Sequence, residues 1–168
     1  MTVQSTLSIR AATPADSPAL GRLGALLVRT HHDLDPKRFM SANAGTERGY
    51  GAFLVSELER EGVVVLAAEM DGEVVGYTYA GIEGTDWMAL RGPAGVVYDI
   101  VVDPERRRAG IGRRLLEATL TALVDRGAPR VVLSTAERNE TAQRLFADIG
   151  FRRTMIEMTW ERPDGNRT

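Results

Sequence analysis

The sequence predicts an α+β domain whose elements run in the order β-α-α-β-β-β-α-β-α-β. Apolar residues recur at helical spacing in four segments, and β-branched or alternating runs fill six others. No interior linker or repeat divides the chain. Because 168 residues are typical of one domain, we expect a single domain over residues 1–168.

Six segments have the composition and the alternation of strands. They are Leu7–Ala11, Val63–Met70, Glu73–Ile82, Gly95–Val102, Arg130–Thr135 and Phe151–Trp160. The dipeptide Asp71-Gly72 separates the second from the third and predicts a hairpin turn. The fourth is strongly apolar, so we expect it to be buried on both faces.

Four segments have helical periodicity. The first helix starts after Thr13 or Asp16, which can cap it, and ends before the loop formed by His31–Pro36. The others are expected at Thr46–Arg60, Gly112–Asp125 and Asn139–Ile149. Residues 162–168 are expected to be a disordered tail.

Composition excludes several classes of protein. The chain contains no cysteine, which rules out a disulfide scaffold, a thiolate metal site and a cysteine nucleophile. A net charge of −2 gives no sign of a nucleic-acid partner, and no apolar run is long enough to span a membrane. Since the N-terminus also lacks a signal-peptide pattern, the expected location is cytoplasmic.

The residues from Tyr98 to Leu116 carry the clearest chemical signal. An apolar strand leads into a loop with Gly110 and Gly112, which opens a helix, and five of the nine residues 106–114 are arginine. A helix N-terminus with glycines and arginines favours a phosphate or pyrophosphate ligand. A P-loop is excluded because Arg113 follows Gly112, and a dinucleotide fingerprint is excluded because position 115 is Leu115.

Two motifs in this chain resemble the GNAT superfamily of N-acetyltransferases. Residues 102–112 read Val-Asp-Pro-Glu-Arg-Arg-Arg-Ala-Gly-Ile-Gly, similar to the family's cofactor motif. Residues 139–151 read Asn-Glu-Thr-Ala-Gln-Arg-Leu-Phe-Ala-Asp-Ile-Gly-Phe, similar to its second motif. The resemblance covers nearly the whole chain and implies a mixed, splayed β-sheet flanked by helices. It also implies acetyl-CoA as co-substrate, with no metal.

The resemblance assigns cofactor-binding roles. The pyrophosphate of acetyl-CoA would lie on the loop and helix start formed by Arg107, Arg108, Ala109, Gly110, Ile111, Gly112 and Arg113. The strand residues Ile100, Val101 and Val102 would pair with the pantetheine arm through their backbone, and a neighbouring N–H could polarise the thioester carbonyl. Asn139 would contact the arm from the far side. An acceptor amine would then attack directly, without an acyl-enzyme.

The chain departs from the family pattern at two positions. Phe146 stands where the family often has a tyrosine that protonates the leaving thiolate. Tyr98, Tyr77 or Tyr79 could take that role, or the thiolate could leave unassisted, since thiol pKa values lie near 8.5. Some members also have a glutamate base at a position that is Ser134 in this chain.

Asp99 is the leading candidate for a general base, because it is an acid inside an apolar strand. A purely structural role for Asp99, bonded to backbone or to an arginine, is equally open. Glu69 and Glu83 are weaker rivals, because acids at strand ends are usually solvated.

The expected acceptor is a primary amine, with a small molecule favoured over a protein. His31, Asp35, Trp87 and Ser134 are the candidate acceptor-binding residues. A metal site at His31-His32-Asp33 with Asp35 is disfavoured, because two adjacent histidines at a helix end point in different directions. Trp87 could equally be core or a dimer contact, and a homodimer is expected by family resemblance.

Two rival functions stay open: a CoA-binding module without catalysis, and nucleic-acid binding through the arginine run.

Overall fold

A five-stranded sheet forms the centre of the computed structural model, which describes residues 6–106 and 110–163. The strands are β1 (Leu7–Ala11), β2 (Val63–Met70), β3 (Glu73–Glu83), β4 (Ala94–Val102) and β5 (Val131–Leu133), in that spatial order. Strands β1 to β4 are antiparallel, whereas β5 pairs with β4 in parallel. The sheet is therefore mixed, as the sequence predicts.

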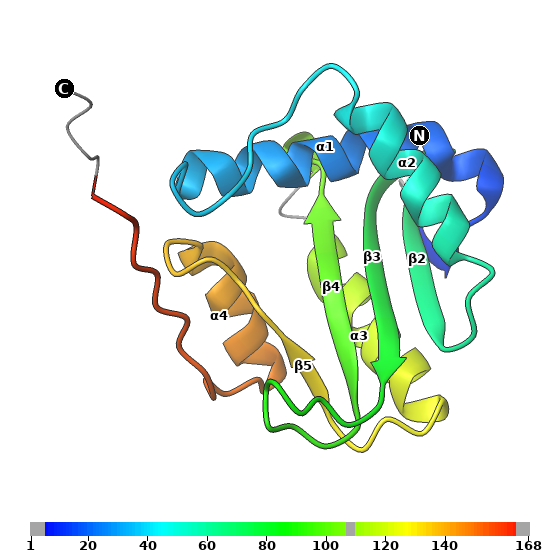
Figure 1. Cartoon of the computed structure of the whole chain (residues 1–168). Coiled ribbons are helices and arrows are strands. Elements are labelled where there is room, and N and C mark those ends of the chain that lie inside the picture. The colour runs from blue at the N-terminus through cyan, green and yellow to red at the C-terminus, as the bar shows by residue number, and fades with distance from the viewer. Residues whose placement is uncertain (1–5, 107–109, 164–168) are drawn as a thin grey trace, which may run out of the picture.

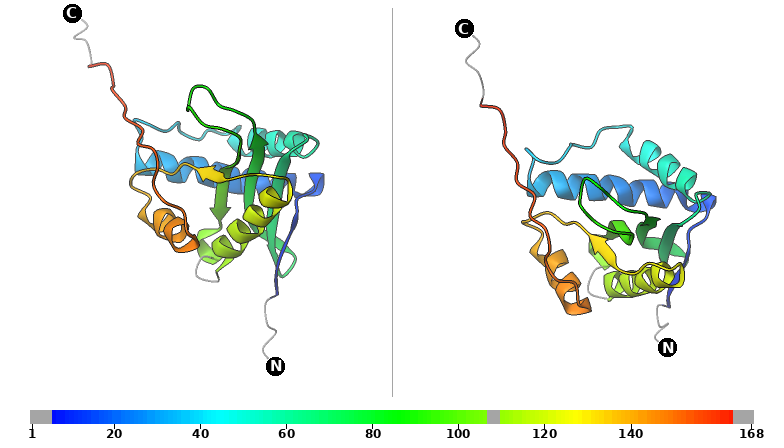
Figure 2. Two further views of the ribbon diagram at one scale, coloured as in Figure 1. Left: turned by 90° about the horizontal axis from the view of Figure 1, so that it is seen from below. Right: turned by 60° about the horizontal axis from the view of Figure 1, so that its bottom comes forward.

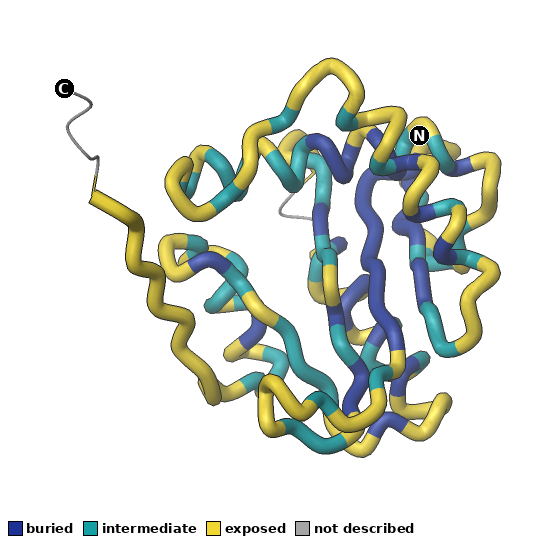
Figure 3. Tube along the Cα trace, in the orientation of Figure 1, coloured by how far each residue is buried: buried dark blue, intermediate teal, exposed yellow. Residues whose placement is uncertain are grey.

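Helices cover both faces of this sheet (Figures 1 and 2). The described helices are α1 (Ser17–Leu34), α2 (Thr46–Glu57), α3 (Ile111–Asp125) and α4 (Glu140–Ile149), with short 3₁₀ turns at Pro14–Asp16 and Pro104–Arg106. Helices α1 and α2 lie on one face and α3 on the other, while α4 lies beside β5. This arrangement places β3 in the middle of three layers, and Figure 3 shows it buried along nearly its whole length.

The core divides into two sides because β-strand side chains alternate between the faces. Leu20, Leu23, Leu54, Tyr77 and Val101 pack together between the sheet and helices α1 and α2. The α3 side holds a second set, which includes Leu115, Leu116, Leu123 and Phe146. Helix α1 therefore forms because its leucines, spaced three and four residues apart, all face one layer.

Helices α1 and α2 approach each other closely where α1 has glycine. A Cβ added at Gly24 would lie 2.2 Å from Cδ1 of Tyr50. The ring of Tyr50 therefore fills the space that a side chain at position 24 would occupy, and this contact fixes the direction of its hydroxyl group. The helix pair thus positions a residue that matters for the site described below.

Most element boundaries agree with the sequence prediction, but those of α1 and β5 do not, and α2 ends at Glu57 rather than Arg60. Helix α1 continues through His31 and His32 to Leu34, because the break comes at Asp35-Pro36, where proline disfavours helix at the residue before it. Strand β5 has three residues rather than six, since it leaves β4 after Leu133.

The predicted sixth strand, Phe151–Trp160, is wrong for this structure. Residues 152–163 run as an exposed chain outside α4 and make no described strand pairing (Figures 1 and 3). We call them the C-terminal arm. Alternation correctly indicates an extended conformation, but a strand also needs a neighbour with which to share hydrogen bonds. Of the expected disordered tail 162–168, residues 164–168 lie outside the described part.

Candidate functional site

The edge of β4 that faces β5 is open over half of its length. Strand β5 pairs with β4 only at Gly95, Val96 and Val97, and the two strands then diverge (Figure 1). On its other side β4 stays paired with β3 up to Val102. In the described chain, residues 98–101 thus have a strand neighbour on one side only. Their outward backbone groups can pair with an extended ligand, as an added strand would.

Helix α3 begins close to the end of this open edge. Gly110 precedes it with a φ of 70°, a left-handed conformation that glycine adopts without strain. A Cβ at Gly112 would lie 3.3 Å from Leu145 of α4, so α3 and α4 approach closely here. The free N–H groups of the first turn favour an anion. Arg107, Arg108 and Ala109, three of the expected cofactor residues, lie outside the described residues.

A β-bulge in β4 turns two consecutive side chains to the same face. Tyr79 pairs with Asp99 and Ala80 pairs with Val97, which leaves Tyr98 as the extra residue. Val97 and Ile100 pack on the α3 side. Tyr98 stacks on Tyr79, whereas Asp99 meets Tyr77, and both of those tyrosines lie in the α1/α2 core. The bulge therefore brings both predicted catalytic residues to the α1/α2 side.

Asp99 is partly buried between two tyrosine hydroxyl groups. Tyr50 of α2 donates to Oδ2 at 2.6 Å and Tyr77 of β3 donates to the same oxygen at 3.0 Å. Burial raises the pKa of Asp99 above its ordinary value, while the two hydroxyl donors and the nearby His31 act in the opposite direction. The net rise brings the carboxyl group closer to the range in which a base works near neutral pH.

The other two tyrosines of the chain also donate to carboxylates. Tyr79 donates to the buried Glu57 at 2.6 Å, and Tyr98 donates to Glu83 at 2.7 Å. Arg60 lies 2.7 Å from Glu57, and Arg91 lies 2.6 Å from Glu83. All four tyrosines, with Asp99, Glu57 and Glu83, thus form one polar surface on the α1/α2 side, which we call the tyrosine face.

The tyrosines of this face hold their protons tightly. Burial is the first cause that raises the pKa of Tyr50, Tyr77 and Tyr79, and in each case a carboxylate adds to it. Tyr98 is the most exposed of the four, and burial together with Glu83 raises its pKa to about 12. A phenol in this state donates hydrogen bonds well and releases its proton poorly at neutral pH.

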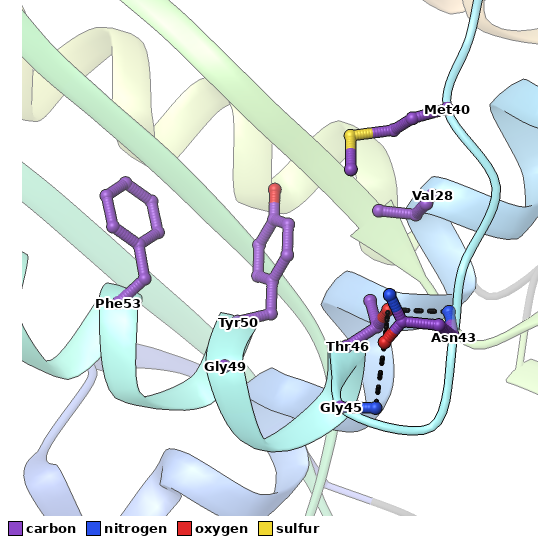
Figure 4. A pocket seen from close by; sticks show the side chains of 8 residues that line it. All are labelled: Val28, Met40, Asn43, Gly45, Thr46, Gly49, Tyr50 and Phe53. Atoms are coloured by element: carbon purple, nitrogen blue, oxygen red, sulfur yellow. Dashed lines mark hydrogen bonds between the residues drawn. The ribbon is translucent and has the colours of Figure 1, made fainter.

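A pocket of about 410 Å³ opens at the end of the tyrosine face. It lies between α1, the loop before α2 and α2 itself, and its lining residues are Val28, Met40, Asn43, Gly45, Thr46, Gly49, Tyr50 and Phe53. Figure 4 shows the rings of Tyr50 and Phe53 standing side by side from α2, with Met40 and Val28 opposite. The loop is held by Asn43, whose Oδ1 accepts from the N–H of Gly45 at 2.8 Å.

The expected acceptor residues do not gather in one place. His31 lies on α1 against Phe39, and its Nδ1 is 2.9 Å from the carbonyl oxygen of Leu27. Asp35 uses its carboxylate to accept from the N–H of Lys37 at 3.1 Å, a local turn. Trp87 is exposed at the tip of the β3–β4 loop and Ser134 is exposed after β5, and neither lines the pocket.

Two further expectations concern single side chains. The side chain of Asn139 caps α4 by accepting from the N–H of Ala142 at 3.2 Å. Glu69 of β2, a rival base, is paired with Arg10 of β1 at 2.7 Å.

Sequence reasoning missed Tyr50 and Glu57 as site residues. Helical spacing could have indicated them, because 50, 53 and 57 fall on one face of α2.

Neither a metal site nor a membrane span is found in the described residues. No group of three or more histidine, aspartate or glutamate side chains gathers there as metal ligands would. None of the described helices combines the length and hydropathy that crossing a bilayer requires.

Comparison of the chain with known protein families gives a match over the part that holds the open edge and the two motifs. The model of the "Acetyltransferase (GNAT) family" matches residues 28–151. The chain belongs to this family. The resemblance noted from the two motifs is thereby confirmed.

Relatives of known name are similar over part of their length. A mycothiol acetyltransferase of Thermobispora bispora is 39% identical over 99 residues, which cover 56% of this chain and 32% of that protein. An uncharacterized N-acetyltransferase of Archaeoglobus fulgidus is 32% identical over 108 residues, 63% of this chain and 69% of that protein. The chain thus spans about a third of the length of that mycothiol acetyltransferase.

Solved structures share the fold at low sequence identity. The BH1408 protein of Bacillus halodurans, in a mutant form, has a TM-score of 0.77 at 22% identity, covering 92% of this chain and 99% of that one. Aminoglycoside N-acetyltransferase AAC(6')-Iy, solved with CoA, has a TM-score of 0.71 at 18% identity over 97% and 99% of the two chains. The GNAT-like α+β fold is therefore confirmed, although the sixth strand is not formed.

The family position of the tyrosine acid is apolar in this structure. Phe146 is buried among the residues of the α3 side, and its ring centroid lies 6.1 Å from that of Phe151. It therefore acts as a core residue here and offers no proton.

Proposed function

We propose that this chain transfers the acetyl group of acetyl-CoA to a primary amine on a small molecule. One observation supports the proposal most strongly: residues 98–101 of β4 carry an open backbone edge and, through the bulge, a partly buried carboxylate at Asp99. A donor on the edge and an acceptor on the tyrosine face would therefore meet across a single strand.

The residues present fit acetyl-CoA. An extended amide-rich arm can pair with the backbone of residues 98–101, and its pyrophosphate can reach the N–H groups at the start of α3, where Gly110 and Gly112 leave the backbone uncovered. Asn139 caps the start of α4 with its side-chain oxygen, and its amide N–H groups would donate to the arm. When bound, acetyl-CoA supplies an activated acetyl thioester.

Asp99 is the base in this proposal. It takes a proton from the ammonium form of the acceptor, and the free amine then attacks the thioester carbonyl. Tyr50 and Tyr77 hold the carboxylate in place through their hydroxyl groups. His31 acts on Asp99 through its electrostatic influence, which lowers the pKa of that carboxyl group.

The thiolate leaves without a tyrosine acid. Each tyrosine hydroxyl donates to a carboxylate, and Tyr98, the exposed one, would have to leave Glu83 to serve as an acid. A CoA thiolate is stable enough to depart unaided, since thiol pKa values lie near 8.5. An N–H at the open edge would polarise the carbonyl group as negative charge develops on it.

The pocket supports a small acceptor. Its volume of about 410 Å³ falls within the range of small-molecule sites. The aromatic rings of Tyr50 and Phe53, and the carboxylate of Asp99 at the Tyr50 hydroxyl group, favour a cationic amine. Relatives named mycothiol acetyltransferases and fold neighbours named aminoglycoside N-acetyltransferases agree with this size class.

A homodimer, the expected assembly, finds support in the apolar C-terminal arm.

The test is free-CoA release from acetyl-CoA over a panel of small amines and one lysine peptide, with acetyl-CoA binding followed by calorimetry. Release that depends on a small amine, and not on the peptide, is the expected result. Binding without release for any amine would favour the rival reading, a CoA-binding module, for which the apolar Phe146 is the supporting observation. No binding would contradict both readings.

A further inference from the structure

The C-terminal arm exposes an unusual set of large apolar side chains. Met155, Ile156, Met158 and Trp160 are 77%, 83%, 86% and 81% exposed. Ile156, Met158 and Trp160 alternate with Glu157 and Thr159, so an extended chain presents these three on one face. A strand with one apolar face is a segment built to be half-buried, and no other described part of this chain covers it.

The sheet of the same molecule ends in an open edge. Strand β5 is last in the strand order, has three residues and pairs only with β4 among the described strands. Its outer N–H and C=O groups point away from β4 and offer a template for one more strand. The arm and this edge are therefore complementary in backbone as well as in hydrophobic character.

Two polar contacts hold the arm away from its own β5. The guanidinium of Arg38, on the loop after α1, donates to both carboxylate oxygens of Glu157, one of them at 3.0 Å. Arg153 donates to the side-chain oxygen of Gln143 on α4. In Figure 1 the arm accordingly rises outside α4 towards the end of α1.

Chain direction distinguishes a second copy from the same copy. In Figure 1, β5 and the arm run in the same general direction, because α4 returns the chain between them. Folding back would make the arm parallel to its own β5. In a two-fold dimer the partner's arm would run antiparallel to β5, the pairing that is slightly more stable per residue.

The antiparallel arrangement also matches the surface at the start of β5. The start of β5 lies next to the β3–β4 loop, since the N–H of Gly95 donates to the carbonyl oxygen of Arg130 at 2.8 Å. That loop exposes Trp87, Met88 and Leu90. An antiparallel arm brings its Trp160 end to this apolar loop, whereas a parallel arm would carry that end away from it.

We propose that the C-terminal arm is an exchanged strand, which pairs antiparallel with β5 of a second copy of this chain and covers the loop at Trp87, Met88 and Leu90. Each copy gives one arm and receives one, so the contact is two-fold and closed. The apolar side chains of both arms then leave water, and both sheets gain an outer strand.

The absence of cysteine makes a direct test clean. Val132→Cys and Met158→Cys chains are purified separately, mixed, unfolded, refolded together and treated with a short bismaleimide. The expected result is a covalent product of twice the chain mass that contains one copy of each variant. A Val124→Cys chain, changed at an exposed position on α3, replaces Val132→Cys as the matched control and gives no such product.

Oligomeric state supplies the second measurement, by light scattering after gel filtration. We expect a dimer for the full chain, a monomer for a chain ending at Phe151, and at least a tenfold weaker dimer for Ile156→Asp. Thr159→Asp, on the opposite face of the arm, is the matched control and retains the dimer. Both tryptophans are 81% exposed in one copy, so dimer formation also shifts their emission to shorter wavelength.

Three outcomes would overturn the proposal. A product formed only within a chain that carries both cysteines would show that the arm folds onto its own β5. A monomer at tens of micromolar would show that the arm has no partner copy. A dimer that survives removal of the arm would place the contact on another surface. Each measurement is independent of acetyl transfer, so failure of the proposed function leaves this test unaffected.

Discussion

The two sides of β4 that make up the candidate site are built from different parts of the chain. At the open edge, β4 and the start of α3 present backbone groups, and glycines leave them uncovered. On the tyrosine face, the working groups are side chains from α2, β3 and β4, tied together by hydrogen bonds. We therefore expect substitutions at the edge to act through shape and those on the face to act through charge and proton position.

The largest effect is expected from Asp99→Asn. The amide has nearly the same shape as the carboxyl group but cannot accept the acceptor's proton, so kcat/KM for the amine should fall by about 10²–10⁴. The Kd for acetyl-CoA should stay the same. Steady-state kinetics and calorimetry on the same preparations measure the two quantities. Glu69→Gln, a change at the rival acid that pairs with Arg10, is the control and should retain the rate.

At the edge, Gly110→Ala should weaken acetyl-CoA binding by about tenfold. The φ of 70° at Gly110 is unfavourable for an L-residue by about 1–2 kcal/mol, so the loop would move away from the conformation that presents its N–H groups. Calorimetry gives the Kd, and the KM for the amine should change little. Gly84→Ala, where an added Cβ meets nothing within 4 Å, is the matched glycine control. Equal effects of the two changes would argue against a backbone role for Gly110.

Gly24→Ala tests the tyrosine face through shape alone. The new Cβ would lie 2.2 Å from the ring of Tyr50, so the ring must move and carry its hydroxyl away from Asp99. Overpacking of this kind costs about 1–3 kcal/mol. We expect a several-fold higher KM for the amine and a lower Tm, with the Kd for acetyl-CoA retained. A normal KM together with a lower Tm would mean that Tyr50 is only a packing residue.

A smaller effect is expected from Tyr50→Phe, seen in the pH dependence. Hydrogen bonds to the charged carboxylate lower the pKa of Asp99, so removing one donor raises that pKa further. Because the charged form is the base, the acidic limb of the profile of kcat/KM against pH should move to higher pH. Tyr79→Phe, which loses a bond to Glu57 instead, should leave the limb in place.

The smallest effect concerns stability. The folded state raises the pKa of Asp99, so it favours the neutral carboxyl group. The stabilisation from that neutral form is complete below the ordinary value near 3.9 and is lost as pH rises through the raised value. The Tm of the wild type should therefore decline relative to Asp99→Asn as pH rises above about 4. A constant difference in Tm between pH 4 and 8 would contradict a raised pKa of Asp99.

The two sides of the site also differ in how far the sequence predicts them. The open edge and the helix start follow from a continuous motif, because Val102 to Gly112 lie together in the chain and the backbone does the binding. The tyrosine face combines residues 50, 57, 77, 79, 83, 98 and 99, and only the packing of α2 on the sheet brings them together. Asp99 was identified from its apolar neighbours, whereas its partner Tyr50 was not.

The C-terminal arm was missed for the opposite reason. Its alternation is a correct local signal for an extended chain, but pairing depends on a neighbour that one copy does not provide. The prediction that His31 and His32 lie in a loop is wrong for a simpler reason: the helix ends at Asp35-Pro36 and not at the start of the polar run. Local patterns therefore predict conformation here better than they predict contacts.

The bulge at Tyr98 has a consequence for how such a strand can change during evolution. It adds one residue to β4 and so shifts the phase of every side chain after it, which is why Val97 and Ile100 can share one face while Tyr98 and Asp99 share the other. A substitution at position 98 or 99 changes the side chain at the site but keeps the alternation of the following β4 side chains between the two faces of the sheet. A deletion there would turn Val101 from the α1/α2 core towards α3 and disturb both cores together. New acceptor chemistry is thus open to this strand through replacement of residues, while its length is held fixed by the packing on either side.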